Sequence, residues 1–178
     1  MRFKPFVVLL GICLLAVFIG AVLAEEGEET KKEEVKHQYI GASKCKICHK
    51  KSGVYESWEA TPHAKAWENL PEAEQKKQEL RQYYTTGTTE KGELLTGVQC
   101  EACHGPGSDY KTKSVMEDIE KATANGLIIP TKETCMTCHN EKAPAKLAAL
   151  AKDFDMEKLM DKGVHILPSK MEKTEEKK

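Results

Sequence analysis

Hydrophobic residues are most concentrated at the start of the chain, where residues 6–23 form one apolar run. Two basic side chains, Arg2 and Lys4, precede the run, and Ala24 followed by acidic residues ends it. A basic start, an apolar centre and a small residue at the cleavage point are typical of a secretory signal peptide. The sequence therefore predicts removal of residues 1–24 on export, with an uncleaved membrane anchor through residues 6–23 as the alternative.

Beyond this leader the hydrophobic pattern is that of short helices, and no stretch shows the sustained alternation of a β-sheet protein. Gly87 and Gly92 indicate a loop or a small hairpin, and Gly105-Pro106-Gly107 breaks the chain again. The pattern thus predicts a mostly α fold of short helices and loops with little or no β structure. Helices are expected at residues 50–59, from Thr61-Pro62 onwards, at 72–83, at 114–125 and at 143–162, where Gly163 ends the last one.

Charged residues dominate both ends of the chain after the leader. Residues 25–37 and 169–178 hold few apolar side chains, which predicts a charged linker at one end and a disordered tail at the other. The folded domain is expected between them, at residues 38–168.

The composition changes once the leader is set aside. Of the 178 residues 40% are hydrophobic, but the part after the leader is only about one-third apolar and keeps a single phenylalanine, Phe154. Its 25 basic and 28 acidic residues give a net charge of −3, which argues against a nucleic-acid-binding protein. Export also excludes a cytosolic enzyme. The chain after the leader therefore has a thin core for a globular domain.

Six of the seven cysteines fall into three C-x-x-C-H units, and the seventh, Cys13, is expected to leave with the leader. This spacing is the attachment motif of c-type haem. Two thiols one helical turn apart reach the two vinyl groups of a porphyrin, and the adjacent histidine is the proximal iron ligand. The units are Cys45-Lys46-Ile47-Cys48-His49, Cys100-Glu101-Ala102-Cys103-His104 and Cys135-Met136-Thr137-Cys138-His139.

A redox dithiol or a structural zinc site would also use paired cysteines. Zinc, however, takes cysteine pairs combined in fours, and three pairs divide poorly between such sites. A histidine after all three pairs is also improbable by chance, since histidine supplies only 6 residues of the chain. The sequence thus predicts three covalently bound haem c groups, which would supply the interior that the side chains do not.

The segments between the motifs resemble the cytochrome c-554 family of multihaem c-type cytochromes. The resemblance spans roughly residues 39–165, and it implies a mostly helical electron carrier whose haems pack in close pairs. Members of that family typically bind four haems. Here residues 82–87 stand where the family's second motif would fall, so the resemblance implies a trihaem variant that lacks one motif. The segments that carry it are Tyr39-Ile40-Gly41, Tyr55-Glu56-Ser57-Trp58, Thr61-Pro62-His63-Ala64-Lys65-Ala66 and Gly97-Val98-Gln99-Cys100-Glu101-Ala102-Cys103-His104-Gly105-Pro106-Gly107.

The remaining histidines decide the sixth iron ligands, because a second imidazole saturates a haem that only transfers electrons. By resemblance, His63 caps the haem of His104, with a surface histidine early in a helix as the alternative. His165 is similar to the late histidine that caps the final haem, at His139. Its apolar flanks leave a buried core histidine as the alternative.

The haem of His49 has no such counterpart, because the family's histidine after the second Gly-Pro-Gly segment is absent from residues 107–112. His37 is the histidine left over, and a solvated position before the domain is its alternative. Tyr110 or Met116 as an atypical ligand, and an open iron, are the other outcomes.

Three functions follow from this pattern. The first is a periplasmic electron carrier in a respiratory chain that exchanges electrons with redox protein partners. The second is a small reductase that binds a nitrogen oxide or similar ligand at an open haem on His49, and the third is a subunit of a larger multihaem assembly, as a homo- or hetero-oligomer. Glu101 inside the second motif, set against the lysines around the first one, predicts that an acidic partner docks near the first haem. Those lysines are Lys44, Lys46, Lys50 and Lys51.

Overall fold

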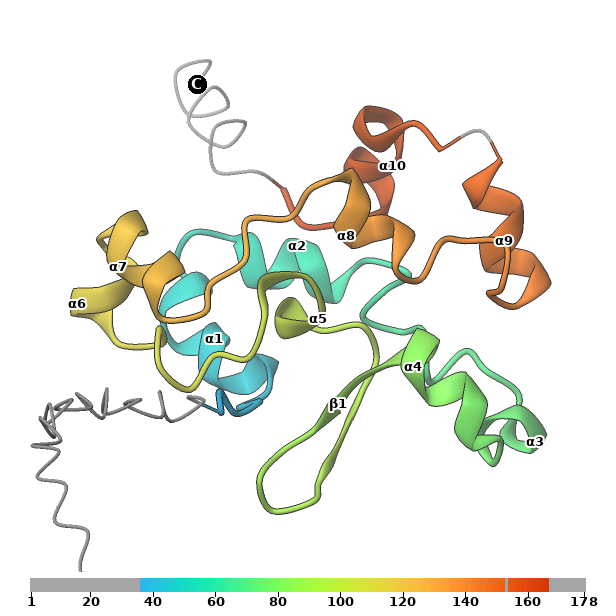
Figure 1. The fold of residues 1–178 in the computed structure, drawn as a ribbon, viewed down its shortest axis with the longest axis horizontal. Helices are drawn as coiled ribbons and strands as arrows, with labels where there is room; N and C mark the ends of the chain where they lie inside the picture. The colour runs from blue at the N-terminus through green and yellow to red at the C-terminus, as the bar shows by residue number, and fades with distance from the viewer. Residues whose placement is uncertain (1–35, 153, 167–178) are drawn as a thin grey trace, which may run out of the picture. The chain divides into compact units, whose positions relative to one another are not determined.

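The structure, a computed structural model, describes residues 36–152 and 154–166, and the part that it describes is built mainly from short helices joined by loops (Figure 1). The expected mostly α fold is confirmed. Ten α-helices and one 3-10 helix lie in the described ranges, together with two short strands. The helices are α1 (Ala42–His49), α2 (Val54–Glu59), α3 (Glu72–Gln75), η1 (Gln78–Leu80), α4 (Arg81–Tyr84), α5 (Cys100–His104), α6 (Lys113–Met116), α7 (Ile119–Ala124), α8 (Lys132–Met136), α9 (Ala145–Ala151) and α10 (Met156–Gly163).

Several helices that the sequence predicts as single elements are divided. The segment 72–83 contains α3, η1 and the start of α4, because Lys77 adopts an extended conformation with ψ 111° between them. Likewise 114–125 is split into α6 and α7, and 143–162 into α9 and α10. The last helix does end at Gly163, as predicted.

The helix expected from Thr61-Pro62 onwards was wrong, because residues 62–69 form turns and no regular helix. The Thr61 hydroxyl nevertheless acts as a cap and accepts a hydrogen bond from the Ala64 N–H, 3.3 Å away. The Thr61 hydroxyl also donates to the Trp58 carbonyl at 2.7 Å, which ties the first turn to the end of α2. His63 is thus presented from a turn that α2 holds in place.

The hairpin indicated by the two glycines is present as β1 (Thr85–Thr88) and β2 (Leu94–Thr96), which pair antiparallel. An irregularity of register lies between Thr85 and Gly87. Residues 82–87, where the resemblance locates the missing haem motif, form the end of α4 and the start of β1, and Figure 1 shows the hairpin as a loop projecting beside α5. Little other β structure exists in the described ranges, as expected.

Few hydrophobic side chains are buried among the described residues, which confirms the expectation of a thin core. Three of the six buried hydrophobic residues are alanines, and the set is Ala42, Leu70, Leu95, Tyr110, Ala122 and Ala143. The predicted leader at 1–24, most of the linker at 25–37 and the tail at 169–178 lie outside the described residues. Within the described ranges no helix has the length and apolar character to cross a membrane.

Candidate haem-binding site

Each C-x-x-C-H unit begins on a helix, which places its two thiols about one turn apart. Helix α1 ends on the first unit, at His49, and α5 consists of the second unit. The third unit starts in the last turn of α8, and Cys138 and His139 continue it in the following turn. Ahead of it, the Thr131 N–H donates to the Thr134 hydroxyl at 3.1 Å, which fixes the start of α8.

All six cysteines of these units are free thiols, and no disulfide joins them. Cys48 is exposed, and the other five are half-buried. Burial raises the pKa of the Cys103 thiol to about 11. The pKa of Cys45 is raised as well, first by a hydrogen bond with Cys100 and then by burial. The same hydrogen bond lowers the pKa of Cys100, so one thiol of the first unit lies against one thiol of the second.

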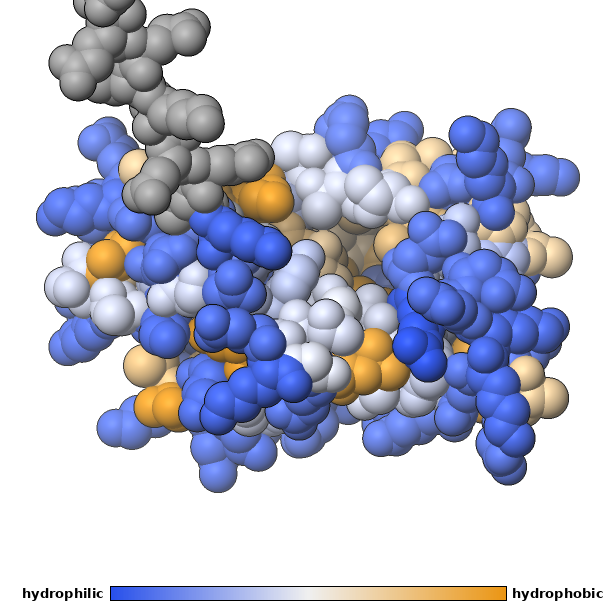
Figure 2. Space-filling view, turned by 60° about the horizontal axis from the view of Figure 1, so that its bottom comes forward, coloured by the Kyte–Doolittle hydropathy of each residue, from blue (hydrophilic) through white to orange (hydrophobic). Residues whose placement is uncertain are grey.

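An apolar cavity of about 640 Å³ opens beside the third unit. That volume is within the range of about 300 to 1,000 Å³ found for ligand and cofactor sites. On the face drawn in Figure 2 most side chains are hydrophilic, and hydrophobic ones line a hollow between them. The cavity lining includes His63, Cys135, Cys138, His139, Leu147 and Phe154.

Two histidine pairs face each other at the spacing that a bound metal needs. The ring centroids of His63 and His139 are 6.0 Å apart, and those of His104 and His165 are 6.1 Å apart. Two metal–nitrogen bonds of about 2 Å each, together with the half-widths of the rings, fill such a gap. The donor set therefore fits an iron held between two imidazoles, in both pairs.

The pairing is the reverse of the one that the resemblance implies. His63 was expected to cap the haem of His104, and His165 that of His139, but the structure sets His63 opposite His139 and His165 opposite His104. The hydrogen bonds of these segments explain the exchange. The His63 ring is bonded to the Gly163 carbonyl, at 2.5 Å, and Ile166 donates its N–H to the Ser57 hydroxyl of α2, at 3.0 Å.

Backbone carbonyls fix the orientation of three of these rings through Nδ1. His63 bonds to Gly163, His104 to the carbonyl of Ile128 at 3.0 Å, and His165 to the carbonyl of Ile166 at 3.0 Å. Such a bond directs the proton to Nδ1 and leaves Nε2 as the metal-binding nitrogen. Burial lowers the pKa of His63 and of His104, which keeps both imidazoles neutral and able to bind a metal.

His139 differs from the other three histidines. Its Nδ1 atom is buried and makes no hydrogen bond with the described residues, although the Leu147 backbone lies next to it. Its ring also lies against Phe154, with centroids 5.9 Å apart. A half-buried ring whose Nδ1 is buried with so few polar contacts fits a residue whose position is completed by a bound group.

The first unit has no imidazole partner at this spacing among the described residues, although the charge of His165 contributes, after burial, to the lowered pKa of His49. Among the described residues neither His49 nor His37 belongs to a ring pair at this spacing. The structure gives His37 another partner instead, because its Nδ1 lies 2.6 Å from a carboxylate oxygen of Asp109. The opposite edge of the ring lies against Gly126, where a Cβ atom would come 3.0 Å from Nε2.

Tyr110 is excluded as an atypical ligand of the first haem. Its side chain is buried, and its hydroxyl donates to the carbonyls of Gly105 at 2.6 Å and His104 at 3.1 Å. Burial, with the charge of Glu101 as a second cause, raises the pKa of Tyr110. The phenol thus stays protonated and bonded to the backbone. Met116, the other candidate, lies half-buried at the end of α6.

Sequence reasoning missed the groups that orient the histidines. Asp109 was read only as part of a segment that lacks a histidine, and the carbonyls of Gly163 and Ile128 carry no signal in a sequence. Glu101 was also misread, because it is buried and adds nothing to the surface charge. A carboxylate inside the second motif, next to residues that are otherwise small, was the one signal that pointed to burial.

Comparisons with known proteins show the family and the fold of the chain. The family model described as outer membrane cytochrome MtrC/MtrF-like, domains II/IV, matches residues 24–170. Cytochrome c-554 of Nitrosomonas europaea is 34% identical over 136 residues, and that match covers 57% of this chain and 57% of the relative, so the chain spans little more than half of that protein. The structure of the reduced state of cytochrome c554 from Nitrosomonas europaea has a TM-score of 0.55 at 23% sequence identity, and the match covers 72% of this chain and 85% of that one. This likeness shows the mainly helical fold.

Proposed function

This chain belongs to the outer membrane cytochrome MtrC/MtrF-like family of multihaem c-type cytochromes, and from that membership we propose that it is an exported trihaem electron carrier. The proposal includes cleavage of residues 1–24 and a periplasmic location. Its partners are redox proteins that donate and accept the electrons. Assembly of the chain into a larger multihaem complex is compatible with this role.

In this proposal each pair of motif cysteines holds one haem c through thioether bonds, and the motif histidine is the proximal ligand. His63 is the sixth ligand of the haem at His139, and His165 that of the haem at His104. When bound, each haem supplies an iron that accepts and releases one electron. The chain's own residues orient the imidazoles through Nδ1, and the apolar cavity beside the third motif would enclose the third haem.

The observation that carries the proposal is the pair of histidine–histidine spacings of 6.0 and 6.1 Å around two of the three motif histidines. An iron with two imidazole ligands has no position left for a substrate, and it changes little in geometry between its two oxidation states. Such haems serve electron transfer. Two of the three predicted haems thus have the ligand set of a carrier.

The haem at His49 favours a second candidate function, because no imidazole lies opposite its motif histidine in the described chain. His37 is the one histidine left for it, and its Nδ1 contact with Asp109 leaves Nε2 as the nitrogen that would bind. If His37 does not bind, that iron is open to a nitrogen oxide or a similar small ligand, and the protein is a small reductase.

The experiment compares carbon monoxide difference spectra of the reduced wild type and of His37→Ala. The carrier proposal, with His37 as a ligand, predicts almost no change in the wild type and uptake by one haem in three in the variant. Uptake by one haem in the wild type, unchanged by the substitution, contradicts His37 ligation and favours the reductase. The variant His63→Ala is the positive control, because in this proposal it removes the sixth ligand of the haem at His139, whose ring centroid lies 6.0 Å from that of His63.

A further inference from the structure

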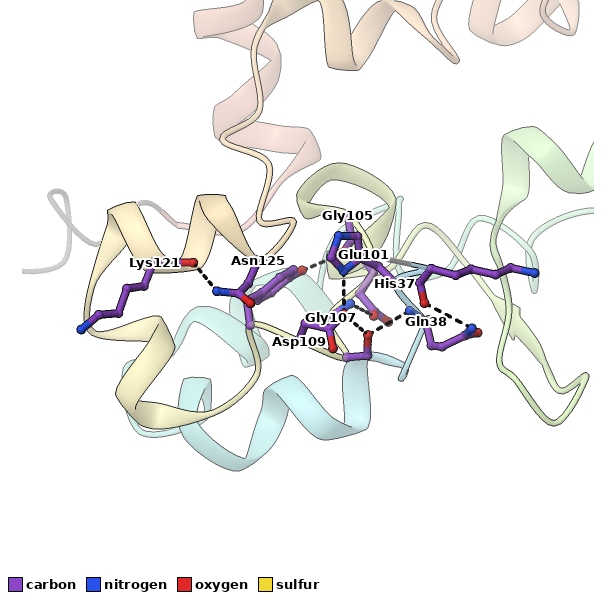
Figure 3. Close-up of polar contacts among 11 residues, drawn as sticks. His37, Gln38, Glu101, Gly105, Gly107, Asp109, Lys121 and Asn125 are labelled. Atoms are coloured by element: carbon purple, nitrogen blue, oxygen red, sulfur yellow. Dashed lines mark hydrogen bonds and ion pairs between the residues drawn. The ribbon is translucent and has the colours of Figure 1, made fainter. Parts of the chain in front are cut away.

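Glu101 is the one large side chain that is fully buried among the described residues, with 1% of its surface exposed. It lies inside the second motif, on α5, and its carboxylate is surrounded by three backbone N–H groups from two segments (Figure 3). Oε1 accepts from Gly107 at 2.7 Å and from Ile40 at 3.0 Å. Oε2 accepts from Gly41 at 2.7 Å and, less closely, from Ile40 at 3.2 Å.

Every contact of this carboxylate is therefore donated to it. An ionised carboxylate only accepts hydrogen bonds, whereas a protonated one would have to place a donor among these N–H groups. No lysine, arginine or histidine of the described ranges forms an ion pair with Glu101. Its negative charge is thus stabilised by backbone dipoles alone and is not cancelled by a neighbouring cation.

The same contacts join the first two haem motifs. Gly41 is the residue that precedes α1, the helix of the first motif, and the next N–H, of Ala42, donates to the Gln99 side-chain oxygen at 2.7 Å. The start of α1 is therefore held by Gln99 and Glu101, which lie on either side of Cys100. Gly107 leaves little room at this point, because a Cβ atom there would come 2.9 Å from Ile40 and 3.1 Å from Oε1 of Glu101.

The charge of Glu101 acts on the pKa of one cysteine in each of the first two motifs, Cys45 and Cys100. It contributes to the raised pKa of Cys45, after the hydrogen bond with Cys100 and burial. The pKa of Cys100 is lowered, mainly by its hydrogen bond with Cys45, and the charge of Glu101 opposes that shift. In the third motif Glu101 is not among the causes that raise the pKa of Cys135.

We propose that Glu101 is a positioning residue that holds α1 against the second motif and places a fixed negative charge between the first two haems. This inference rests on the proposed haem attachment. A ferric iron carries one more positive charge than a ferrous iron, so a buried negative charge favours the oxidised form of its neighbours. Glu101 thereby lowers the reduction potentials of the haems at His49 and His104 and leaves the one at His139 nearly unaffected.

The test is a redox titration of the haem-loaded variant Glu101→Gln, which keeps the shape of the side chain and removes its charge. At a fixed solution potential we expect the ratio of reduced to oxidised haem to rise about tenfold for two of the three haems, a shift of about 59 mV for a one-electron couple. The third haem should keep its wild-type ratio. Glu90→Gln is the matched control, because the same charge is removed from an exposed side chain on the hairpin loop.

A second variant separates the two roles. Glu101→Asp keeps the charge but shortens the side chain, so we expect a lower melting temperature with reduction potentials close to those of the wild type. Unchanged ratios in Glu101→Gln, or raised ratios in Glu101→Asp, overturn the electrostatic role. If Glu101→Gln does not accumulate as a loaded protein, the positioning role is supported. The effect of charge is then judged from Glu101→Asp, where a raised ratio of reduced to oxidised haem, despite the retained charge, overturns the electrostatic role. Intact mass separates the two proposals, since fewer than three haems in the wild type would refute haem attachment rather than the role of Glu101.

Discussion

His63 and His165 present the same chemical feature, a ring whose Nδ1 is bonded to a backbone carbonyl and whose Nε2 is free to bind iron. Replacing either one with alanine should leave one iron without its sixth ligand. We therefore expect His63→Ala and His165→Ala each to convert one haem in three to the high-spin form, as measured by electron paramagnetic resonance of the oxidised protein. A low-spin spectrum in either variant would show that the ring is not a ligand.

The pairing is tested by removing the third haem from each of these variants. When Cys135 and Cys138 are also replaced by alanine, the high-spin signal of His63→Ala should disappear, because the haem that His63 faces is gone. The signal of His165→Ala should persist, since its partner is His104. The opposite result would restore the pairing implied by the resemblance.

Buried neutral histidines also predict how stability depends on pH. Burial lowers the pKa of His63 and of His104 below the value of about 6.5 that an unfolded histidine has. The unfolded chain then binds more protons than the folded one below that pH, so the free energy of unfolding is highest above about pH 7 and falls on acidification. The loss is at most about 1.4 kcal/mol per pH unit for each group. Thermal unfolding between pH 7.5 and 5 measures it, and a melting temperature that stays constant over this range contradicts it.

At the scale of residues, the attachment motifs can be read from the sequence, whereas the two histidine ring pairs of the structure cannot. The spacing of C-x-x-C-H is a local property, so the cysteines and the proximal histidines can be read directly from the sequence. Which ring faces which depends on contacts between distant segments, such as that of His63 with Gly163, 100 residues apart. The misreading of Glu101 has the same origin, since its burial depends on Ile40 and Gly41 in another segment.

Among the elements, the turn that carries His63 depends on Gly97 and Val98, which lie in the segment between β2 and α5. The Val98 N–H donates to the His63 carbonyl at 2.9 Å, and the Val98 carbonyl accepts from the Trp58 ring N–H at 3.0 Å. Gly97 has a φ of +78°, and a Cβ atom there would overlap the Ala64 carbonyl oxygen. The backbone at Gly97 therefore has room for no side chain.

Gly97→Ala should lower the free energy of unfolding by about 2 kcal/mol or more, because it combines backbone strain with a clash. It should also displace His63 and produce part of the high-spin signal seen in His63→Ala. Gly92→Ala is the matched control, because Gly92 has a similar φ of +80° but nothing within 4 Å of the added Cβ. Its expected cost is about 1 kcal/mol with a wild-type spectrum. Equal effects of the two substitutions would refute the role of the contact with Ala64.

The boundaries of the helices were the least predictable feature at this scale. The pattern over 72–83 favours a helix throughout, but Gln75 turns its amide to the carbonyls of Trp67 and Leu70 at 3.0 and 2.8 Å. These contacts fasten α3 to the preceding turn and allow the chain to change direction at Lys77. Helices of three to eight residues are held mainly by tertiary contacts, so their ends are set by partners that a local pattern does not contain.

For the whole molecule, the proposed haems would supply much of the interior, because few hydrophobic side chains are buried among the residues that the structure describes. Replacing Cys100 and Cys103 with alanine should therefore remove one haem and destabilise the remaining structure by about 3 kcal/mol or more, as a large cavity in a core does. Chemical denaturation of the two loaded proteins measures the difference. A variant that lacks one haem and unfolds at the wild-type denaturant concentration would contradict this view of the core.

The central claim is that all three C-x-x-C-H units of this chain carry a covalent haem. The most direct test is the intact mass of the protein purified from a host that has the machinery for haem c maturation. The account predicts the mass of residues 25–178 plus three haems, and a loss of one haem for each motif whose two cysteines are replaced by alanine. A wild-type mass with fewer than three haems would contradict it.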